Sequence, residues 1–183
     1  STISIYSHAT LYQREDSKIT IDSLDIGDYV EYSNLGELSC SNNQFNLINA
    51  LITTINPNFG FDLIIQSDFP KSSGLGGSSV VLASIIGCFN EFRKDKWTSY
   101  EIAEIAFESE RLHLGISGGW QDQYATVFGG FNFIEFKSDE NLVFPMRLKK
   151  EIKYELEESL ILCYTKTTHD SNLIHENQKL TSL

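Results

Sequence analysis

Apolar and polar residues alternate along the first part of the chain. The stretches "ISIYSHATLY" (3–12), "KITIDSL" (18–24) and "DYVEYS" (28–33) show this alternation, with polar turns between them. A period of two is typical of strands that bury one face. We therefore predict an antiparallel meander, followed by a further strand in "GFDLIIQSDF" (60–69).

Two segments change to a helical spacing of apolar residues. In "NQFNLINALITTI" (43–55) apolar residues recur at helical intervals, and Pro57 follows where the helix should end. The segment "SVVLASIIGCFNEF" (79–92) is too long and too apolar for a typical strand. It runs into the cations of "RKDK", which suit the C-terminus of a helix. We predict a helix over each segment.

The rest of the chain mixes helices and strands. A helix should start at Thr98, where Thr98 and Glu101 form a capping-box pattern, and end near Leu114. The segment "DQYATVFGGFNFIEF" (122–136) is helical at first and alternates after its two glycines. We also predict a strand within "LEESLILCYTKT" (156–167) and the start of a helix in 170–183. The predicted class is α+β.

Composition narrows the range of partners. The 183 residues carry a net charge of −11, which argues against nucleic acid and anionic membranes because those ligands need clustered Lys and Arg. The three cysteines are widely spaced and odd in number, so we expect buried thiols and neither a disulfide framework nor a metal site. The apolar run "VVLASIIGCF" is too short to span a bilayer and no signal peptide opens the chain. We predict a cytoplasmic protein.

A glycine- and serine-rich loop precedes the helix predicted at 79–92. In "PKSSGLGGSS" (70–79) the glycines leave backbone N–H groups open to a ligand, and the helix dipole adds a positive end. Such a loop is suited to phosphate. The alternative is an ordinary strand-to-helix turn in which glycine and serine meet only backbone and capping needs.

Three common nucleotide or hydrolase patterns do not fit. A Walker A loop requires a lysine after its second glycine, and none follows Gly74 at the required spacing. The dinucleotide pattern G-x-G-x-x-G meets Ser79 at its third glycine, and no βαβ unit precedes it. The segment "GISGG" (115–119) matches G-x-S-x-G but follows a helix, whereas the nucleophile elbow of hydrolases follows a strand.

One carboxylate of the helix predicted at 98–114 falls on its apolar side. With about 100° of rotation per residue, Glu110 joins the stripe of Ala103, Ala106, Phe107 and Leu114. A buried carboxylate needs a partner. That partner is either an arginine or backbone donor, or a Mg²⁺ shared with a bound phosphate. The polar side of the same helix is expected to hold Glu101, Glu104, Glu108 and Arg111.

A second carboxylate follows the glycine turn at 115–119. Asp122 lies between Gln121 and Gln123 at the start of a predicted helix. It is either an N-cap or a group that orients a sugar hydroxyl and accepts its proton. The residues alone leave both interpretations open.

The combination of these features resembles the GHMP kinases. The resemblance rests on P-x-x-x-G-L-G-[GS]-S-S, an internal glutamate and a glycine turn with an aspartate, and it covers essentially the whole chain. The string "LGISGGWQDQYATVFGGFNFIEF" (114–136) is similar to the branch of sugar kinases that act on heptose phosphates. Trp120 departs from that branch, where we expect a polar or basic residue.

The resemblance implies a role for each matching residue. Asp122 would be the catalytic base or orienting carboxylate, while Ser78 and Glu110 would bind Mg²⁺. The sugar site would include Gly118, Gly119, Gln121 and Asp122. The ATP phosphates would be held by Lys71, Ser72, Ser73, Gly74, Leu75, Gly76, Gly77, Ser78 and Ser79.

The resemblance also implies a domain plan and a reaction. Residues 1–152 would form most of an N-terminal domain of the ribosomal protein S5 domain 2 type, without its first strand, and residues 153–183 the beginning of a truncated ferredoxin-like C-terminal domain. Two family motifs would then lie outside the segment, so we expect the segment alone to be a poor catalyst. The oligomeric state stays open, a homodimer included.

The implied reaction transfers the γ-phosphoryl group of ATP to the anomeric hydroxyl of D-glycero-D-manno-heptose 7-phosphate. Two alternatives stay open. One is a GHMP kinase for another acceptor, such as a galactose-like sugar, homoserine or mevalonate. The other is a nucleotide-binding module without transfer activity.

Overall fold

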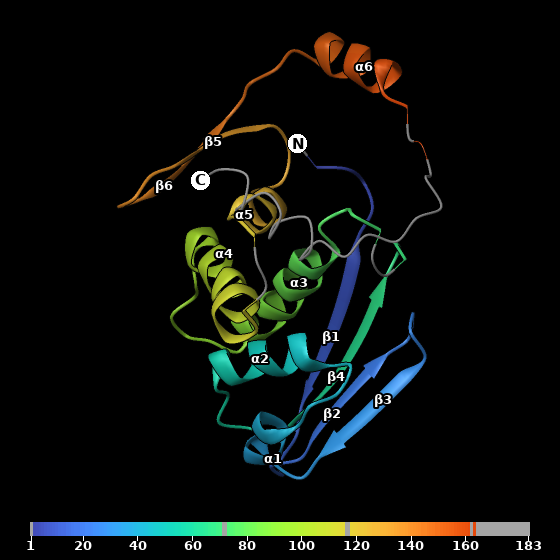
Figure 1. The fold of residues 1–183 in the computed structure, drawn as a ribbon, viewed down its shortest axis with the longest axis vertical. Coiled ribbons are helices and arrows are strands. Elements are labelled where there is room, and N and C mark those ends of the chain that lie inside the picture. The colour runs from blue at the N-terminus through green and yellow to red at the C-terminus, as the bar shows by residue number, and fades with distance from the viewer. Residues whose placement is uncertain (1, 71–72, 116–117, 162, 164–183) are drawn as a thin grey trace.

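The protein contains a four-stranded sheet, helices that pack on one face of it, and a separate two-stranded hairpin (Figure 1). The computed structural model describes residues 2–70, 73–115, 118–161 and 163. The strands are β1 (Ser7–Gln13), β2 (Ile19–Ser23), β3 (Asp28–Tyr32), β4 (Phe61–Ser67), β5 (Asn132–Phe136) and β6 (Asn141–Pro145). The helices are α1 (Leu35–Cys40), α2 (Asn46–Ile55), α3 (Gly77–Glu91), α4 (Ser99–Phe107), the π-helical turn η1 (Glu108–His113), α5 (Gln121–Phe128) and α6 (Lys150–Ser159).

The four-stranded sheet is not the predicted meander. Its order is β1-β4-β2-β3, so β1 pairs with β4 and not with β2. β4 lies antiparallel to β1, with Leu11 opposite Leu63, and parallel to β2, with Ile21 opposite the same leucine. The prediction of individual strands is confirmed, but their pairing is different because α1 and α2 carry the chain across the sheet before β4 enters between β1 and β2.

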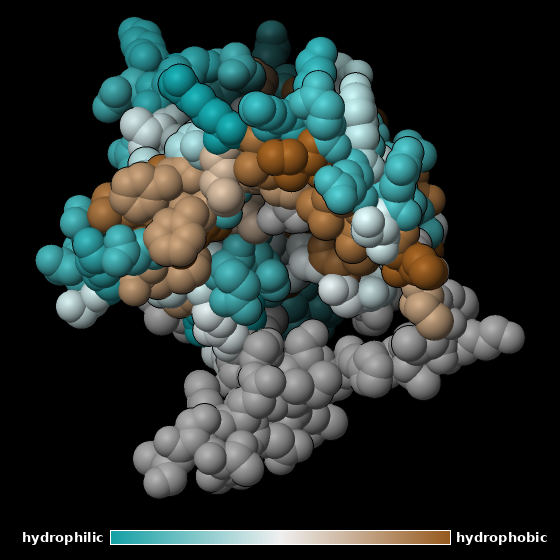
Figure 2. All heavy atoms as spheres, turned by 90° about the horizontal axis from the view of Figure 1, so that it is seen from above, coloured by the Kyte–Doolittle hydropathy of each residue, from teal (hydrophilic) through white to brown (hydrophobic). Residues whose placement is uncertain are grey.

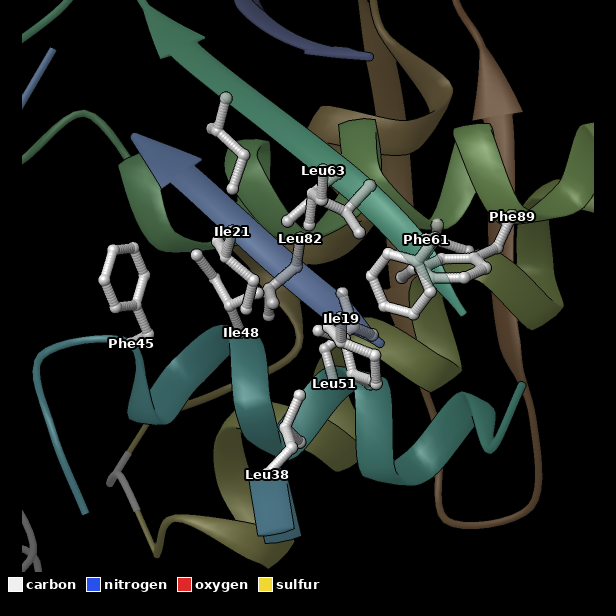
Figure 3. Packing of buried hydrophobic residues seen from close by; sticks show 14 of the residues in the cluster. Ile19, Ile21, Leu38, Phe45, Ile48, Leu51, Phe61, Leu63, Leu82 and Phe89 are labelled. Atoms are coloured by element: carbon white, nitrogen blue, oxygen red, sulfur yellow. The ribbon is translucent and has the colours of Figure 1, made fainter. Parts of the chain in front are cut away.

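The core lies between this sheet and the helices. β2 and β4 bury alternate residues, as the sequence pattern predicts, and present Ile19, Ile21, Phe61 and Leu63 to α2 and α3 (Figure 3). Polar groups gather on the opposite face, where the Asp62 carboxylate accepts hydrogen bonds from Arg14 and Thr20. The inward face of β4 therefore holds the helices on the sheet.

The helix predicted from Thr98 to Leu114 changes type along its length. Thr98 and Glu101 form the expected capping box. The α-helix ends at Phe107, and residues 108–113 continue as a π-helical turn. A π turn holds more residues per turn than an α-helix, so the predicted polar side holds for the exposed Glu108 but is wrong for Arg111. Arg111 is turned inward, with its side chain only 9% exposed.

Other differences from the prediction concern shorter elements. α1, β6 and α6 were not predicted. The strand predicted within 156–167 is wrong over residues 156–159, which belong to α6, and most of the remainder lies outside the described residues, as does the helix predicted in 170–183. The cysteines also differ from expectation, since Cys88 is partly buried but Cys40 and Cys163 are exposed, all three as free thiols.

Apolar side chains are exposed on the hairpin and on α6. Figure 2 shows brown, hydrophobic residues gathered on the face of the molecule seen from above. No helix among the described residues is long and apolar enough to cross a membrane. The large exposed apolar residues of these elements include Phe133, Phe136, Phe144, Ile152, Tyr154 and Leu156.

The burial pattern of β4 makes a prediction about stability. Leu63 is fully buried, so Leu63→Ala should lower the free energy of unfolding by about 2–5 kcal/mol because it leaves a cavity. Gln66→Ala, at an exposed position of the same strand, should change it by less than about 0.5 kcal/mol. Urea unfolding of both variants measures the difference, and equal effects would contradict the placement of the core.

Candidate phosphate-binding site

The glycine-rich loop opens helix α3 in the way a phosphate site requires. Gly76 is the N-cap residue and has a left-handed backbone with φ of 69°, and Gly74 has φ of 74°. No side chain caps this helix in the described part of the chain. The N–H groups of the first turn, in residues 77–79, therefore lack the partner that a capping side chain would give. They are available to an anion, which the positive end of the helix dipole also attracts.

Only some of the residues predicted to bind the ATP phosphates belong to the part of this loop that the structure describes. Lys71 and Ser72 lie outside the described residues. Ser73, Gly74 and Leu75 are exposed, while Ser79 is fully buried under the start of α3. A side chain at Gly77 would bring its Cβ within 2.7 Å of the Phe69 ring. Glycine at this position therefore lets Phe69, which follows β4, approach the helix closely.

Glu110 is buried directly beneath the loop. Its side chain is 4% exposed, and its carboxylate accepts hydrogen bonds from the Ser78 hydroxyl at 2.6 Å and the Ser79 hydroxyl at 3.3 Å. Arg111 Nη1 lies 3.7 Å from Oε1 of the same carboxylate. The structure thus brings together the two residues predicted to bind Mg²⁺. It also supplies the arginine partner of the alternative interpretation.

The π-helical turn explains why neighbouring charged residues both face inward. Glu110 and Arg111 are consecutive in η1, which packs against α2. In a regular α-helix consecutive side chains diverge by about 100°, and the wider i→i+5 turn changes the direction in which the residues after Phe107 point. A local π turn of this kind is frequent at functional sites.

Asp122 lies next to the loop at Gly76. It is in the first turn of α5, whose N-cap is Trp120, so the N-cap interpretation of Asp122 is wrong. A Cβ built on Gly76 would lie 3.6 Å from Cγ of Asp122. No side-chain hydrogen bond joins Asp122 to a described residue. Its carboxylate therefore stands beside the loop without a structural partner there.

The residues of the predicted sugar site are only partly brought together. Gly118 packs flat on the Arg111 guanidinium, because a Cβ there would come within 2.5 Å of Cζ. Gln121 is exposed, and its amide oxygen lies over Gly119. Gly118 thus lies against Arg111 of η1, and Asp122 follows in the first turn of α5.

Trp120 has a packing role that explains its departure from the expected polar residue. Its ring stacks on Phe107 with centroids 3.5 Å apart and planes 5° apart, and meets the Tyr124 ring edge-on. This stack ties the start of α5 to the end of α4. Trp120 therefore positions the first turn of α5, which carries Asp122.

Gln123 belongs to the site but was missed from the sequence. Its side-chain amide donates to Glu110 Oε2 at 2.7 Å, and the residue is fully buried. The only available signal was its position next to Asp122 in "QDQ". Glutamine is usually exposed, so its residue type gave no reason to predict that Gln123 is buried.

The oxygen donors at the loop fit a magnesium ion that also binds phosphate. Ser78 and Glu110 present adjacent oxygens, and no group of three or more His, Cys, Asp or Glu among the described residues could hold a metal alone. Mg²⁺ commonly takes one or two protein oxygens and completes its shell with phosphate and water. The donor set matches this behaviour and does not match a structural metal centre.

An open hollow of about 970 Å³ lies at the opposite end of β4, between the β1–β2 turn and residues 57–60. Its cation is already paired, since Arg14 donates to Asp16 and to Asp62. The hydrogen bond from Arg14 lowers the pKa of Asp16 to about 2. The arrangement is an ion-pair network on the surface, distant from the glycine loop.

Comparison with known proteins gives one family. Residues 45–130 match the family described as the GHMP kinases N terminal domain. A D-glycero-alpha-D-manno-heptose 7-phosphate kinase from Campylobacter jejuni subsp. jejuni serotype O:2 is 40% identical over 185 residues, which cover 98% of this chain and 54% of that protein. The chain therefore spans about half of the length of this relative.

Solved structures agree. A D-glycero-D-manno-heptose 1-phosphate kinase from Bacteroides thetaiotaomicron is 33% identical with a TM-score of 0.75, over 84% of this chain and 52% of that one. A galactokinase from Lactococcus lactis, 22% identical with a TM-score of 0.68 over 80% and 41% of the two chains, shares the fold. The predicted α+β class is confirmed, and the fold is consistent with the ribosomal protein S5 domain 2 type.

Two glycines, Gly76 at the N-cap of α3 and Gly87 within the helix, test the backbone conformation of the loop. Gly76→Ala should lower the free energy of unfolding by about 1–2 kcal/mol, because alanine is strained at positive φ. Gly87→Ala should raise it by about 0.5–1 kcal/mol, because Gly87 lies within the helix with open space around its Cα. Urea unfolding of both variants checks the opposite signs. Stabilisation by Gly76→Ala would contradict the left-handed cap.

Proposed function

The chain belongs to the GHMP kinases, and we propose on that premise that it forms the nucleotide-binding part of an ATP-dependent sugar kinase. The reaction transfers the γ-phosphoryl group of ATP to the anomeric hydroxyl of D-glycero-D-manno-heptose 7-phosphate. One observation carries the proposal: Ser78, Glu110 and Asp122 converge on the uncapped start of α3. We place the reaction in the cytoplasm.

The loop and α3 hold the donor. The phosphates lie against residues 71–79, where the backbone N–H groups and the helix dipole neutralise part of their charge. Ser78 and Glu110 hold Mg²⁺ through the oxygens that now share a hydrogen bond. When bound, this cation neutralises charge on the phosphates.

Asp122 addresses the acceptor. Its carboxylate stands beside Gly76 and accepts the proton of the attacking sugar hydroxyl. The hydroxyl oxygen forms a bond to the γ-phosphorus as the bond to the β-phosphate oxygen breaks, and the proton passes from Asp122 to solvent. Gly118, Gly119 and Gln121 form part of the sugar pocket beside this carboxylate. Such positioning supplies most of the rate in phosphoryl transfer.

A second domain completes the enzyme in this proposal. Residues 1–152 are assigned to the N-terminal domain and 153–183 to the start of the C-terminal one. Because the boundary at 152/153 falls within α6 and boundaries usually lie in connections, we move it before Lys150. The exposed apolar residues of β5, β6 and α6 support a partner domain, since large apolar patches commonly mark interfaces.

The acceptor has a second candidate because the names of two relatives differ. The relative at 40% identity is a heptose 7-phosphate kinase, and the solved structure at 33% is a heptose 1-phosphate kinase. The higher identity favours the 7-phosphate as acceptor.

An assay with the full-length gene product tests the function. We expect ATP consumption that depends on Mg²⁺ and is fastest with heptose 7-phosphate, compared with heptose 1-phosphate, galactose, mevalonate and homoserine. A preference for another of these acceptors would replace the substrate and retain the class of reaction. Thermal stabilisation by ATP and Mg²⁺ with no turnover on any acceptor would support a nucleotide-binding module and contradict the kinase.

The role of Asp122 gives a separate prediction. Asp122→Asn should lower kcat by roughly 10²–10⁴-fold, the usual contribution of a positioned acid or base, while the affinity for ATP stays nearly constant. Asp139→Asn, an exposed aspartate in the β5–β6 turn, serves as the matched control and should leave kcat unchanged. A kcat near the wild-type value in Asp122→Asn would remove Asp122 from the mechanism.

A further inference from the structure

Gln123 is a buried link between the two carboxylates of the site, because its side chain contacts Glu110 and it directly follows Asp122 in the sequence. It is fully buried in the first turn of α5, and its side-chain nitrogen lies 2.7 Å from Glu110 Oε2. Asp122 is the preceding residue and points toward the loop at Gly76. One turn of helix thus carries both Asp122 and the group that touches Glu110.

The chemistry of the contact fixes the orientation of the amide. An ionised carboxylate can only accept hydrogen bonds, so the NH₂ group of Gln123 must face Glu110. The amide oxygen then points elsewhere, and it has no hydrogen-bond partner among the described residues. A buried acceptor without a partner destabilises a fold. An apolar side chain of similar size would avoid that loss, but it would leave Glu110 Oε2 with only the longer bond from Ser79, so the glutamine serves the carboxylate.

The remaining contacts of Glu110 show what the amide does. Gln123 binds Oε2, whereas the Ser78 hydroxyl binds Oε1 at 2.6 Å. The amide therefore holds the carboxylate plane so that Oε1 stays turned to the loop. Ser79 also reaches Oε2, but at the longer distance of 3.3 Å.

We propose that Gln123 is a positioning residue that holds Glu110 for a divalent cation, an inference that rests on the proposed role of Glu110 in binding Mg²⁺. The free amide oxygen suits the same task. Mg²⁺ in phosphate sites usually keeps several waters, and a buried amide oxygen next to Glu110 can accept hydrogen bonds from them. A residue that orients a ligating carboxylate typically changes metal affinity 10–100-fold when it is replaced.

The test uses Gln123→Met in the full-length gene product, because methionine keeps the length and burial of the side chain without its donor. We expect the dissociation constant of Mn²⁺, measured by electron paramagnetic resonance with a non-hydrolysable ATP analogue, to rise by roughly 10-fold. The Mg²⁺ concentration at half-maximal rate should rise with it, while KM for the sugar stays constant. A purely structural role would not separate these quantities.

Asn49→Leu is the matched control. Asn49 is also a buried amide whose nitrogen is bonded, here to Tyr32 and Ser41, and whose oxygen has no partner among the described residues. Neither of these partners is among the described residues that donate hydrogen bonds to Glu110, so the variant should retain the wild-type affinity for Mn²⁺. Gln123→Leu is a second test variant, and thermal melting establishes that each variant is folded.

The outcomes separate the inference from the function on which it rests. Wild-type protein that fails to bind Mn²⁺ with the analogue would overturn both. Wild-type protein that binds Mn²⁺, with folded Gln123→Met or Gln123→Leu binding it equally well, would overturn the role of Gln123 alone. Unfolding of both Gln123 variants would also overturn it, because glutamine would then be required by the fold.

Discussion

A carboxylate buried in a protein must be surrounded by donors, and the site is built around this requirement at Glu110. Its side chain is 4% exposed and is held by hydroxyls from α3 and an amide from α5, with Arg111 of η1 nearby. Three elements that are separate in the sequence therefore meet at one side chain. Because burial of an unpaired charge is very costly, each of these elements has to keep its place for the others to be stable.

The sequence predicts most elements of the fold but not how they pair. Alternating residues identify β1 to β4 because each of these strands buries one face. Alternation does not indicate which strand lies beside which, and the entry of β4 between β1 and β2 is decided by packing of α2 and α3 on the sheet. α1 and α6 were missed for a different reason. α1 has only six residues, and the end of α6 overlaps the segment 156–167 that was predicted to hold a strand.

The candidate site could be predicted to a similar extent. The burial of Glu110 follows from its place among apolar neighbours, and its meeting with Ser78 agrees with the expectation from the family resemblance. The inward turn of Arg111 could not be predicted, because a π turn depends on a local change in backbone hydrogen bonding that side-chain spacing does not reveal. Asp122 is not an N-cap because the stack of Trp120 on Phe107 starts α5 before it. The position of Gln123 in the first turn of α5 depends on the same helix start.

The central claim is that the Ser78–Glu110 hydrogen bond marks the place of a cation shared with the phosphates of ATP. A crystal structure of the full-length gene product with Mn²⁺ and a non-hydrolysable ATP analogue tests it most directly, because anomalous scattering locates manganese without ambiguity. We expect a manganese ion bonded to the Glu110 carboxylate and the Ser78 hydroxyl, beside the analogue's phosphates. A manganese ion bound to the phosphates elsewhere, with Ser78 still donating to Glu110, would contradict it.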